Sequence, residues 1–147
     1  MVSKALRTAG HRTRRAAHLP PQLRLLVVED DVIIAASLVD DLSEFGFVVV
    51  GPASNLTDAA ATAYTEVLDC ALIDIGLGAE SAIPVVQILT DRHIPVVIMT
   101  GANEMADGIT PDIPVLLKPF SVEELRLALE RVLDTGSCRA PPVHGAA

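Results

Sequence analysis

The chain has 147 residues and half of them are hydrophobic, which suits one folded domain with a substantial core. Aromatic residues make up only 3% of the chain, so the core must be aliphatic, and no apolar run approaches the ~20 residues that span a membrane. The net charge of −8 combines six Lys and Arg and no acid in residues 1–24 with a strongly acidic body, which holds all nineteen Asp and Glu; an acidic body argues against DNA as a partner.

The first 22 residues form a basic arm that differs in composition from the rest of the chain. Lysine and arginines stand there among Ser, Thr and Ala, without the apolar core of a signal peptide. We expect residues 1–22 to be disordered, with an extended translation start or an organelle-targeting segment as alternatives. Cys70 and Cys138 suggest no disulfide framework, which fits a reducing compartment, so a cytoplasmic protein is expected.

Strand and helix signals alternate along the body of the chain. Five short apolar runs are predicted to be strands, at residues 24–28, 47–50, 71–75, 95–100 and 115–118. Four stretches with helical spacing of apolar residues are predicted to be helices, at residues 32–45, 55–67, 81–92 and 122–134. Strands that alternate with helices imply parallel βαβ units with right-handed crossovers, so we expect an α/β fold with a doubly wound, five-stranded parallel sheet.

The predicted helices carry recognisable start signals. Asp31 can cap the first helix, and Asn55 or Thr57 the second. Pro84 is tolerable in the third helix because it lies in the first turn, and Ser121-Val122-Glu123-Glu124 is a capping box for the last helix.

Two regions lack such signals. Between Gly101 and Pro114 the apolar periodicity fails and glycine and proline interrupt the chain, so at most a turn or two of helix fits there. After Thr135-Gly136 a disordered tail is expected over residues 135–147. The folded domain is therefore predicted to span residues 23–134.

Polar side chains stand where the predicted strands end. The first strand runs into Glu29-Asp30-Asp31 and the third ends at Asp74, while Thr100 and Lys118 end the fourth and fifth. Ligands bind at the carboxyl ends of strands in open parallel sheets. We therefore expect these carboxylates, the hydroxyl and the amine to converge on Asp74.

The ordered set Glu29-Asp30, Asp74, Thr100 and Lys118-Pro119 resembles the receiver domain of two-component response regulators. The resemblance covers about residues 23–134 and implies the flavodoxin-like strand order 2-1-3-4-5. It further implies a phosphoprotein of a phosphorelay, with a histidine kinase or a phosphotransfer protein as donor and an unidentified downstream protein as receiver of the signal. A homodimer is possible on this reading, no membrane is involved, and no output domain is expected.

The resemblance also assigns roles to the strand-end residues. Asp30 and Asp74 would ligate Mg²⁺ directly, Glu29 partly through water, and Gly76 through its backbone carbonyl. Asp74 would accept the phosphoryl group while Lys118 and Thr100 bind the transferred oxygens. The implied chemistry is self-phosphorylation and self-dephosphorylation that depend on Mg²⁺, and not turnover of a free substrate.

Three positions depart from the family pattern. Val115 stands where receivers usually have the aromatic switch residue, Gly78 replaces a frequent proline, and the interval from Thr100 to Lys118 is short, which shortens the fourth helix. We expect the segment 101–114, with the adjacent strand and last helix, to change order on phosphorylation and to contact the downstream partner.

Other functions fit the residues less well. A phosphate sink and a pseudo-receiver, which binds partners without phosphorylation, stay open as alternatives. A small α/β enzyme would need a separate substrate pocket, and Gly76-Leu77-Gly78 follows the wrong strand for a dinucleotide fingerprint. Asp-based phosphohydrolases need a second Asp two residues after the nucleophile, where this chain has Gly76.

Overall fold

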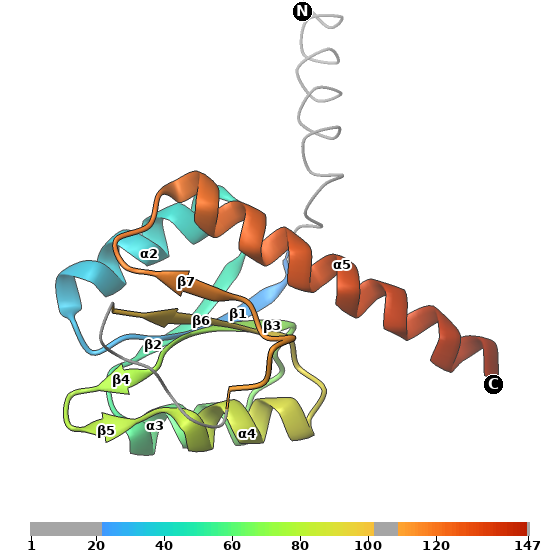
Figure 1. Cartoon of the computed structure of the whole chain (residues 1–147), viewed down its shortest axis with the longest axis horizontal. Helices are drawn as coiled ribbons and strands as arrows, with labels where there is room; N and C mark the ends of the chain where they lie inside the picture. The colour runs from blue at the N-terminus through green and yellow to red at the C-terminus, as the bar shows by residue number, and fades with distance from the viewer. Residues whose placement is uncertain (1–21, 102–108, 147) are drawn as a thin grey trace, which may run out of the picture.

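The computed structural model describes residues 22–101 and 109–146 (Figure 1). The basic arm predicted at residues 1–22 lies outside the described residues except for Gln22. Seven residues of the segment 101–114 also lie outside them. The described part of this segment, residues 109–114, contains turns and no helix.

Five parallel strands form one sheet in the order β2-β1-β3-β6-β7. These strands are β1 (Arg24–Val28), β2 (Val48–Ala53), β3 (Cys70–Asp74), β6 (Val96–Thr100) and β7 (Val115–Leu117). Because β6 and β7 are the fourth and fifth strands of the sheet in chain order, the predicted order 2-1-3-4-5 is confirmed. The central strands β3 and β6 are buried along their whole length, as expected for a parallel sheet covered on both faces.

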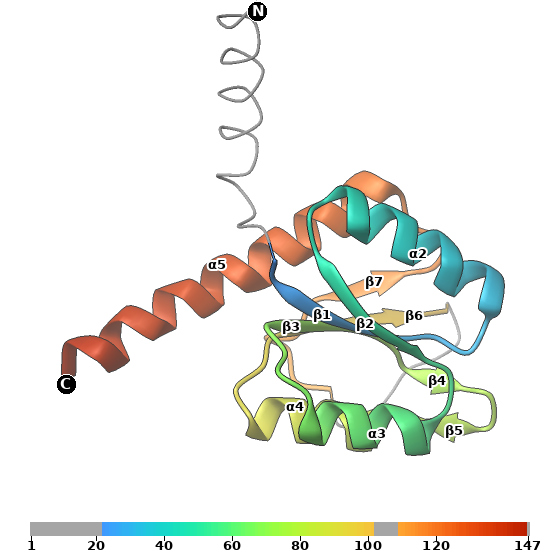
Figure 2. The same cartoon turned by 180° about the vertical axis from the view of Figure 1, so that it is seen from behind.

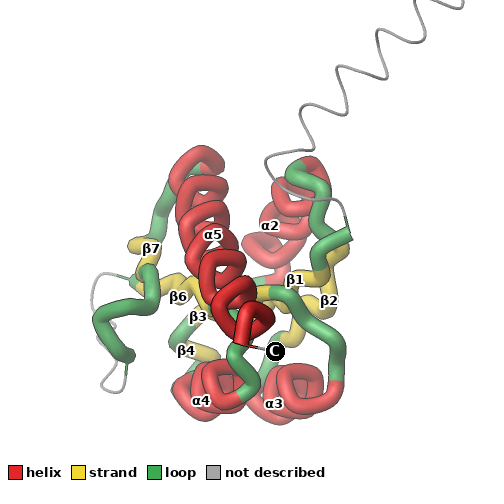
Figure 3. The backbone as a smooth tube through the Cα atoms, turned by 90° about the vertical axis from the view of Figure 1, so that its right-hand side faces the viewer, coloured by secondary structure: helices red, strands yellow, loops and turns green. Residues whose placement is uncertain are grey.

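Helices cover both faces of the sheet, in pairs (Figures 2 and 3). The helices are α2 (Val32–Glu44), α3 (Leu56–Thr65), α4 (Ile83–Asp91) and α5 (Val122–Ala146). On one face α2 and α5 contribute Leu38, Leu42 and Leu129 to an aliphatic core, and on the other face α3 and α4 contribute Ala59 and Leu89 to a second core. The protein thus has the three layers of a doubly wound α/β domain.

The predicted helix caps are present. The Asp31 side chain accepts hydrogen bonds from the backbone N–H groups of Ile33 and Ile34 at the start of α2. Asn55 caps α3, and Ser121 and Glu124 exchange the two hydrogen bonds of a capping box at the start of α5. Each cap satisfies backbone N–H groups that a helix start leaves without an internal partner. The caps therefore fix where α2, α3 and α5 begin relative to the strand before each of them.

A small hairpin follows β3. Strand β4 (Gly76–Leu77) pairs antiparallel with β5 (Glu80–Ser81), and α4 consequently begins at Ile83 and not at residue 81. Leu77 is buried in the core between the sheet and helices α3 and α4, which anchors the hairpin to the domain. Gly78 has a φ of +63°, a left-handed conformation that suits the tight turn between the two strands.

Two further boundaries differ from the prediction. Strand β2 continues through Gly51 and Pro52 to Ala53, because Pro52 lies on an edge strand where no ladder N–H is required on its outer side. Helix α5 extends to Ala146, whereas the sequence predicts a disordered tail from residue 135. Extension of a helix that tertiary contacts have already nucleated adds a hydrogen bond for each residue that carries a backbone N–H, which Pro141 and Pro142 do not, and this requires no apolar face. Figure 1 shows that the end of α5 projects beyond the sheet.

None of the helices in the described part of the chain combines the length and the apolar character needed to cross a bilayer.

We predict that Gly51→Ala destabilises the fold strongly. Gly51 has a φ of +95°, and a Cβ atom there would lie 2.8 Å from the backbone N of Ala53 and 3.0 Å from the carbonyl O of Val27. Since both neighbours are backbone atoms, one in β2 itself and one in the adjacent β1, neither can rotate away, and we expect a loss of about 2 kcal/mol or more in the free energy of unfolding.

Gly46→Ala is the matched control for this substitution. Gly46 also has a positive φ, of +101°, but a Cβ atom there would meet nothing within 4 Å. Gly46→Ala should therefore lower the free energy of unfolding only by the strain of the left-handed conformation, about 1 kcal/mol. Urea denaturation of both variants measures the difference, and equal losses would show that the contacts around Gly51 relax.

Candidate functional site

Three carboxylates meet at the carboxyl-terminal edge of the sheet. Glu29 and Asp30 directly follow β1, and Asp74 ends β3, which is paired with β1 so that Val28 lies opposite Ile73. Each acid offers an oxygen atom, and these oxygens lie within 4.8 Å of one another. Glu29 and Asp74 are buried and Asp30 is exposed. Parallel pairing thus assembles an acidic cluster from residues far apart in the sequence.

Lys118 supplies a positive charge to this cluster. Its Nζ atom lies 2.8 Å from Oε1 of Glu29 and 2.8 Å from Oδ2 of Asp74. The Lys118 side chain is 23% exposed, whereas those of Glu29 and Asp74 are 1% and 6% exposed. One ammonium therefore bridges two nearly buried carboxylates, which compensates part of the cost of removing them from water.

Burial and charge shift the pKa values of this bridged group. Burial raises the pKa of Glu29 to about 7; the hydrogen bond from Lys118 opposes this rise and the neighbouring Asp74 adds to it. For Lys118, burial lowers the pKa, but its hydrogen bonds and attraction to Asp74 and Glu29 outweigh burial and raise the pKa above its ordinary value. Lys118 therefore stays a cation at neutral pH.

Backbone N–H groups hold each of the three acids. Oε2 of Glu29 accepts from Asp31 N–H at 3.2 Å and Oδ1 of Asp74 accepts from Gly76 N–H at 3.2 Å. Oδ2 of Asp30 accepts from Gly78 N–H at 2.9 Å. Such hydrogen bonds restrict the rotation of a carboxylate. The acids are thus held in place in addition to being close together.

Thr100 lies at the end of β6, on the strand next to β3. It is 5% exposed, its carbonyl O accepts from Lys118 N–H at 2.8 Å, and its hydroxyl donates to the Gly101 carbonyl O at 3.2 Å. Gly76 begins β4, two residues after Asp74. Every strand-end residue named from the sequence therefore lies at one edge of the sheet, and Glu29, Asp74 and Lys118 are in direct contact.

One contribution was missed in the sequence, namely the Gly78 N–H that binds Asp30. In the sequence Gly76-Leu77-Gly78 is considered only as a dinucleotide fingerprint, although two glycines around an apolar Leu77 are also compatible with a turn. Two residues between short strands, with glycine first, are typical of a tight hairpin. That signal could have predicted the hairpin, although not the contact with Asp30.

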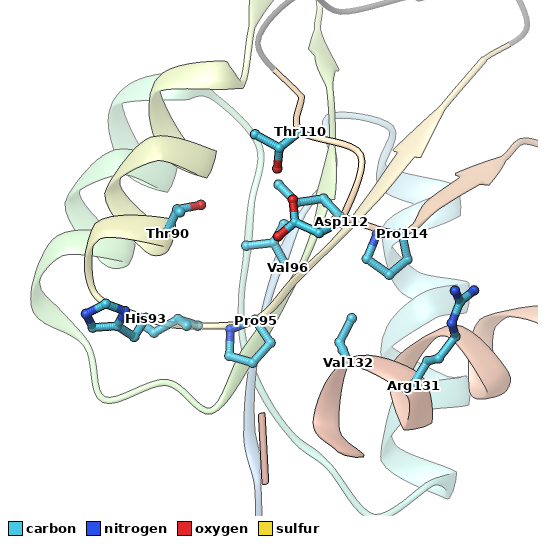
Figure 4. Close-up of a pocket in the computed structure, with 11 residues that line it drawn as sticks. Thr90, His93, Pro95, Val96, Thr110, Asp112, Pro114, Arg131 and Val132 are labelled. Carbon is cyan, nitrogen blue, oxygen red and sulfur yellow. The ribbon is translucent and has the colours of Figure 1, made fainter. Parts of the chain in front are cut away.

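A second cavity lies away from the acidic cluster. Figure 4 shows this cavity, of about 190 Å³, between the end of α4, the start of β6 and residues 110–114. Thr90, Thr110 and Asp112 line it together with the apolar Val96 and Val132. It includes no residue of the acidic cluster, so it offers no substrate pocket for chemistry at Asp74.

Comparison with known protein families identifies the chain. A model of the response regulator receiver domain matches residues 25–130, which is most of the chain. The chain belongs to the receiver-domain family. Receiver domains are signalling domains that interact with histidine kinases or phosphotransfer proteins, and the recognition made from the strand-end residues is confirmed.

Curated relatives share the receiver domain but are longer. The probable transcriptional regulator ycf27 of Guillardia theta is 31% identical over 116 residues, which are 75% of this chain and 45% of that protein. The transcriptional regulatory protein PdtaR of Mycobacterium tuberculosis is 27% identical over 113 residues, which are 73% of this chain and 55% of that protein. The chain thus spans about half the length of the curated relatives it matches.

Solved structures with this fold include other receiver proteins. SdrG from Sphingomonas melonis is 34% identical with a TM-score of 0.69, covering 76% of this chain and 97% of SdrG. The response regulator PhyR from Brucella abortus is 26% identical with a TM-score of 0.75, covering 90% of this chain and 57% of PhyR. The receiver domain of the sensor histidine kinase PA1611 from Pseudomonas aeruginosa was solved with a magnesium ion coordinated in its active-site cleft. It is 20% identical to this chain with a TM-score of 0.68, and the match covers 77% of this chain and 98% of that domain. At this identity the match shows the fold alone.

The acidic cluster fits the Mg²⁺ that receiver domains bind at this place. Mg²⁺ prefers carboxylate, carbonyl and water oxygens, and Glu29, Asp30 and Asp74 offer carboxylates close enough to share one ion. With all groups ionised, three carboxylates and the Lys118 ammonium leave a net charge of −2, which a divalent cation balances. Asp30, Asp74 and Glu29 would hold the ion on the side of the cluster open to solvent.

Magnesium chloride should therefore raise the melting temperature, because an ion that binds only the folded chain stabilises it. At a concentration a hundred times the dissociation constant the gain is about 2.7 kcal/mol. Asp30→Asn should remove most of this rise, since it removes an exposed carboxylate of the cluster. Asp91→Asn, at the end of α4, is the control for loss of an exposed acid elsewhere. Thermal melts with magnesium chloride or with EDTA measure the effect. An equal rise of the melting temperature in Asp30→Asn and Asp91→Asn would contradict a metal site at the acidic cluster.

Proposed function

We propose that this receiver domain accepts a phosphoryl group on Asp74 from a histidine kinase or phosphotransfer protein and signals through protein contacts. The contact that supports this best is the Lys118 bridge between Asp74 and Glu29. It holds a nearly buried carboxylate beside a fixed cation and within reach of two further acids. Such a carboxylate is a weak nucleophile whose charged product is stabilised by the site around it.

The proposed transfer forms an acyl phosphate. An Asp74 carboxylate oxygen forms a bond to phosphorus as the bond between phosphorus and the donor imidazole nitrogen breaks, and the electron pair of that bond stays on the nitrogen, which then takes a proton. A bound Mg²⁺ supplies charge neutralisation on the phosphoryl oxygens. The chain itself contributes position, because Asp74 lies at the end of a fully buried strand and cannot drift relative to Lys118.

Lys118 and Thr100 complete the proposed reaction. The Lys118 ammonium binds the Asp74 carboxylate before transfer. Once Asp74 has become an acyl phosphate, the same ammonium is placed to bind a phosphoryl oxygen. Thr100 ends the neighbouring strand and carries a hydroxyl that can donate to another phosphoryl oxygen. Both residues act on the product charge and neither forms a covalent bond, so we propose them as electrostatic partners of Asp74.

The assembled cluster disfavours the pseudo-receiver alternative. A module that binds partners without phosphorylation has no need of two buried acids and one lysine in direct contact, because burying such charges costs free energy. A phosphate sink uses the same chemistry as the proposed receiver and differs only in its downstream contacts. The segment 101–114, in which we expected the output surface, lies largely outside the described residues.

Asp74→Asn should abolish the gain of phosphoryl mass when the protein is incubated with acetyl phosphate and Mg²⁺. The amide lacks the nucleophilic oxygen charge but keeps the shape of the side chain. Asp31→Asn is the control within the same acidic run: Asp31 caps α2 through Oδ1, a role that asparagine also fills. Intact mass spectrometry should show phosphorylation of Asp31→Asn at the wild-type rate, and an equal mass gain in Asp74→Asn would place the acceptor elsewhere.

An apolar groove beside the site suits the phosphodonor protein. The groove, of about 580 Å³, runs between the start of α2 and the loop from β7 to α5, and Lys118 is one of its lining residues. Ile33, Phe120 and Val122 give it an apolar surface, and Asp41 adds a negative charge. A donor that brings its histidine to Asp74 must pass this groove, so we propose that it presents apolar and basic side chains here.

Ile33→Asp should slow transfer from a protein donor by about tenfold or more, because it places a charge in the apolar contact. Phosphorylation by acetyl phosphate should be unchanged, since that donor needs no docking surface. Val67→Asp is a matched control, because Ile33 and Val67 are 81% and 71% exposed. Val67 lies between α3 and the start of β3, at the amino-terminal ends of the strands and away from the groove. The measurement is the rate of phosphate transfer from the kinase that phosphorylates the wild-type chain fastest in a purified panel; equal effects of both variants would exclude this groove.

A further inference from the structure

The hairpin after β3 makes a contact that the proposed chemistry does not yet use. Its turn residue Gly78 donates its backbone N–H to Oδ2 of Asp30 at 2.9 Å. Glu29 and Asp74 accept their backbone hydrogen bonds from residues two positions further along the chain. Asp30 instead accepts from a residue 48 positions away, at the tip of a separate structural element. The orientation of Asp30 therefore depends on the hairpin.

Asp30 needs such an external restraint more than its two neighbours. Glu29 and Asp74 are buried and each also binds the Lys118 ammonium. Asp30 is exposed, and within the described residues the Gly78 N–H is the hydrogen-bond donor to its side chain. An exposed carboxylate without this contact would sample several rotamers in water, and few of them keep an oxygen near the other two acids.

The hairpin is built to hold its tip in place. Gly76 pairs with Ser81 and Leu77 with Glu80, the Leu77 side chain is buried in the core, and Ala82 N–H donates to the Ile75 carbonyl O at 2.8 Å. The φ of +63° at Gly78 belongs to the tight turn that carries the N–H group bound to Asp30. The pairing of the strands thus fixes the direction of a single amide.

We propose that the β4–β5 hairpin is part of the cation site, and that Gly78 is a positioning residue that orients Asp30 for the metal ion. The proposal rests on the proposed function, because it assigns a partner to one of the acids that would bind Mg²⁺. Residues that hydrogen-bond metal ligands typically change metal affinity by about 10- to 100-fold when they are lost. Here the partner is a backbone group, so its effect depends on the conformation of residue 78 and not on a side chain.

Two substitutions at position 78 distinguish the role of the backbone N–H group from a requirement for glycine itself. Gly78→Pro removes the N–H and cannot adopt a positive φ, and we expect it to weaken Mg²⁺ binding by about tenfold. Gly78→Asn keeps the N–H and tolerates the left-handed conformation, and a Cβ atom at this position meets nothing within 4 Å. Its Mg²⁺ affinity should remain within about twofold of the wild type. Titration calorimetry with magnesium chloride measures all three proteins.

A double-mutant cycle with Asp30→Asn tests whether Gly78 acts through Asp30. If it does, Gly78→Pro should cause no further loss of Mg²⁺ affinity once Asp30 has been replaced. A second full loss in the double variant would overturn the proposal and indicate general damage to the site. Hydrogen exchange without metal gives an independent measurement: the Gly78 amide should be protected in the wild type and at least about tenfold less protected in Asp30→Ala.

The outcomes distinguish this proposal from the proposed function. Absence of Mg²⁺ binding by the wild-type chain would contradict the metal site itself, and the hairpin proposal with it. Binding by the wild type together with equal affinity of Gly78→Pro would overturn the hairpin proposal alone. Loss of affinity in Gly78→Asn equal to that in Gly78→Pro would show that position 78 requires glycine for its backbone and not for its amide.

Discussion

The repulsion among three carboxylates at one edge of the sheet is the constraint on which the site depends. Parallel pairing of β1 and β3 forces Glu29, Asp30 and Asp74 together, although each would be better solvated alone. The Lys118 ammonium compensates two of them directly. The fold therefore holds a net negative charge at the carboxyl-terminal ends of the strands. A cation can bind there and support chemistry that requires one.

The two cores explain how this charge is held still. Above the sheet, α2 and α5 pack on Leu25, Leu72 and Met99, and below it α3 and α4 pack on the opposite faces of the same strands. Because both faces of β1, β3 and β6 are covered, the strand ends have little freedom to move apart. Free energy from aliphatic burial thus offsets the cost of keeping like charges together.

The sequence predicted the parts of this arrangement that local chemistry determines. Short aliphatic runs between glycines and prolines predicted the strands, and Asp31, Asn55 and Ser121 predicted the starts of helices, because caps satisfy backbone N–H groups within a few residues. The resemblance to receiver domains then implied the order of the strands, and the convergence of their polar ends followed from the expected parallel pairing. The acids and Lys118 were found in this way before any contact was known.

The differences lie where distant contacts decide the structure. The hairpin after β3 depends on burial of Leu77 in a core formed by other elements, and although Gly78 is typical of a tight turn, residues 76–81 alone do not reveal the contact with Asp30. Strand β2 extends past Gly51-Pro52 because its neighbour β1 accepts a register shift there. The backbone of α5 continues past Gly136 from a helix that packing has already nucleated, so glycine, read as a stop signal, did not end it.

In the proposed function, the bridge formed by Lys118 would also link metal binding to phosphorylation. In the proposed reaction the negative charge of Asp74 is lost when the acyl phosphate forms, and the phosphoryl group brings about two negative charges in its place. Lys118 is a single cation and already serves two acids, so it cannot compensate this increase. The phosphorylated chain would then bind a divalent cation more tightly than the unmodified chain, and by thermodynamic reciprocity the cation would favour the phosphorylated state by the same factor.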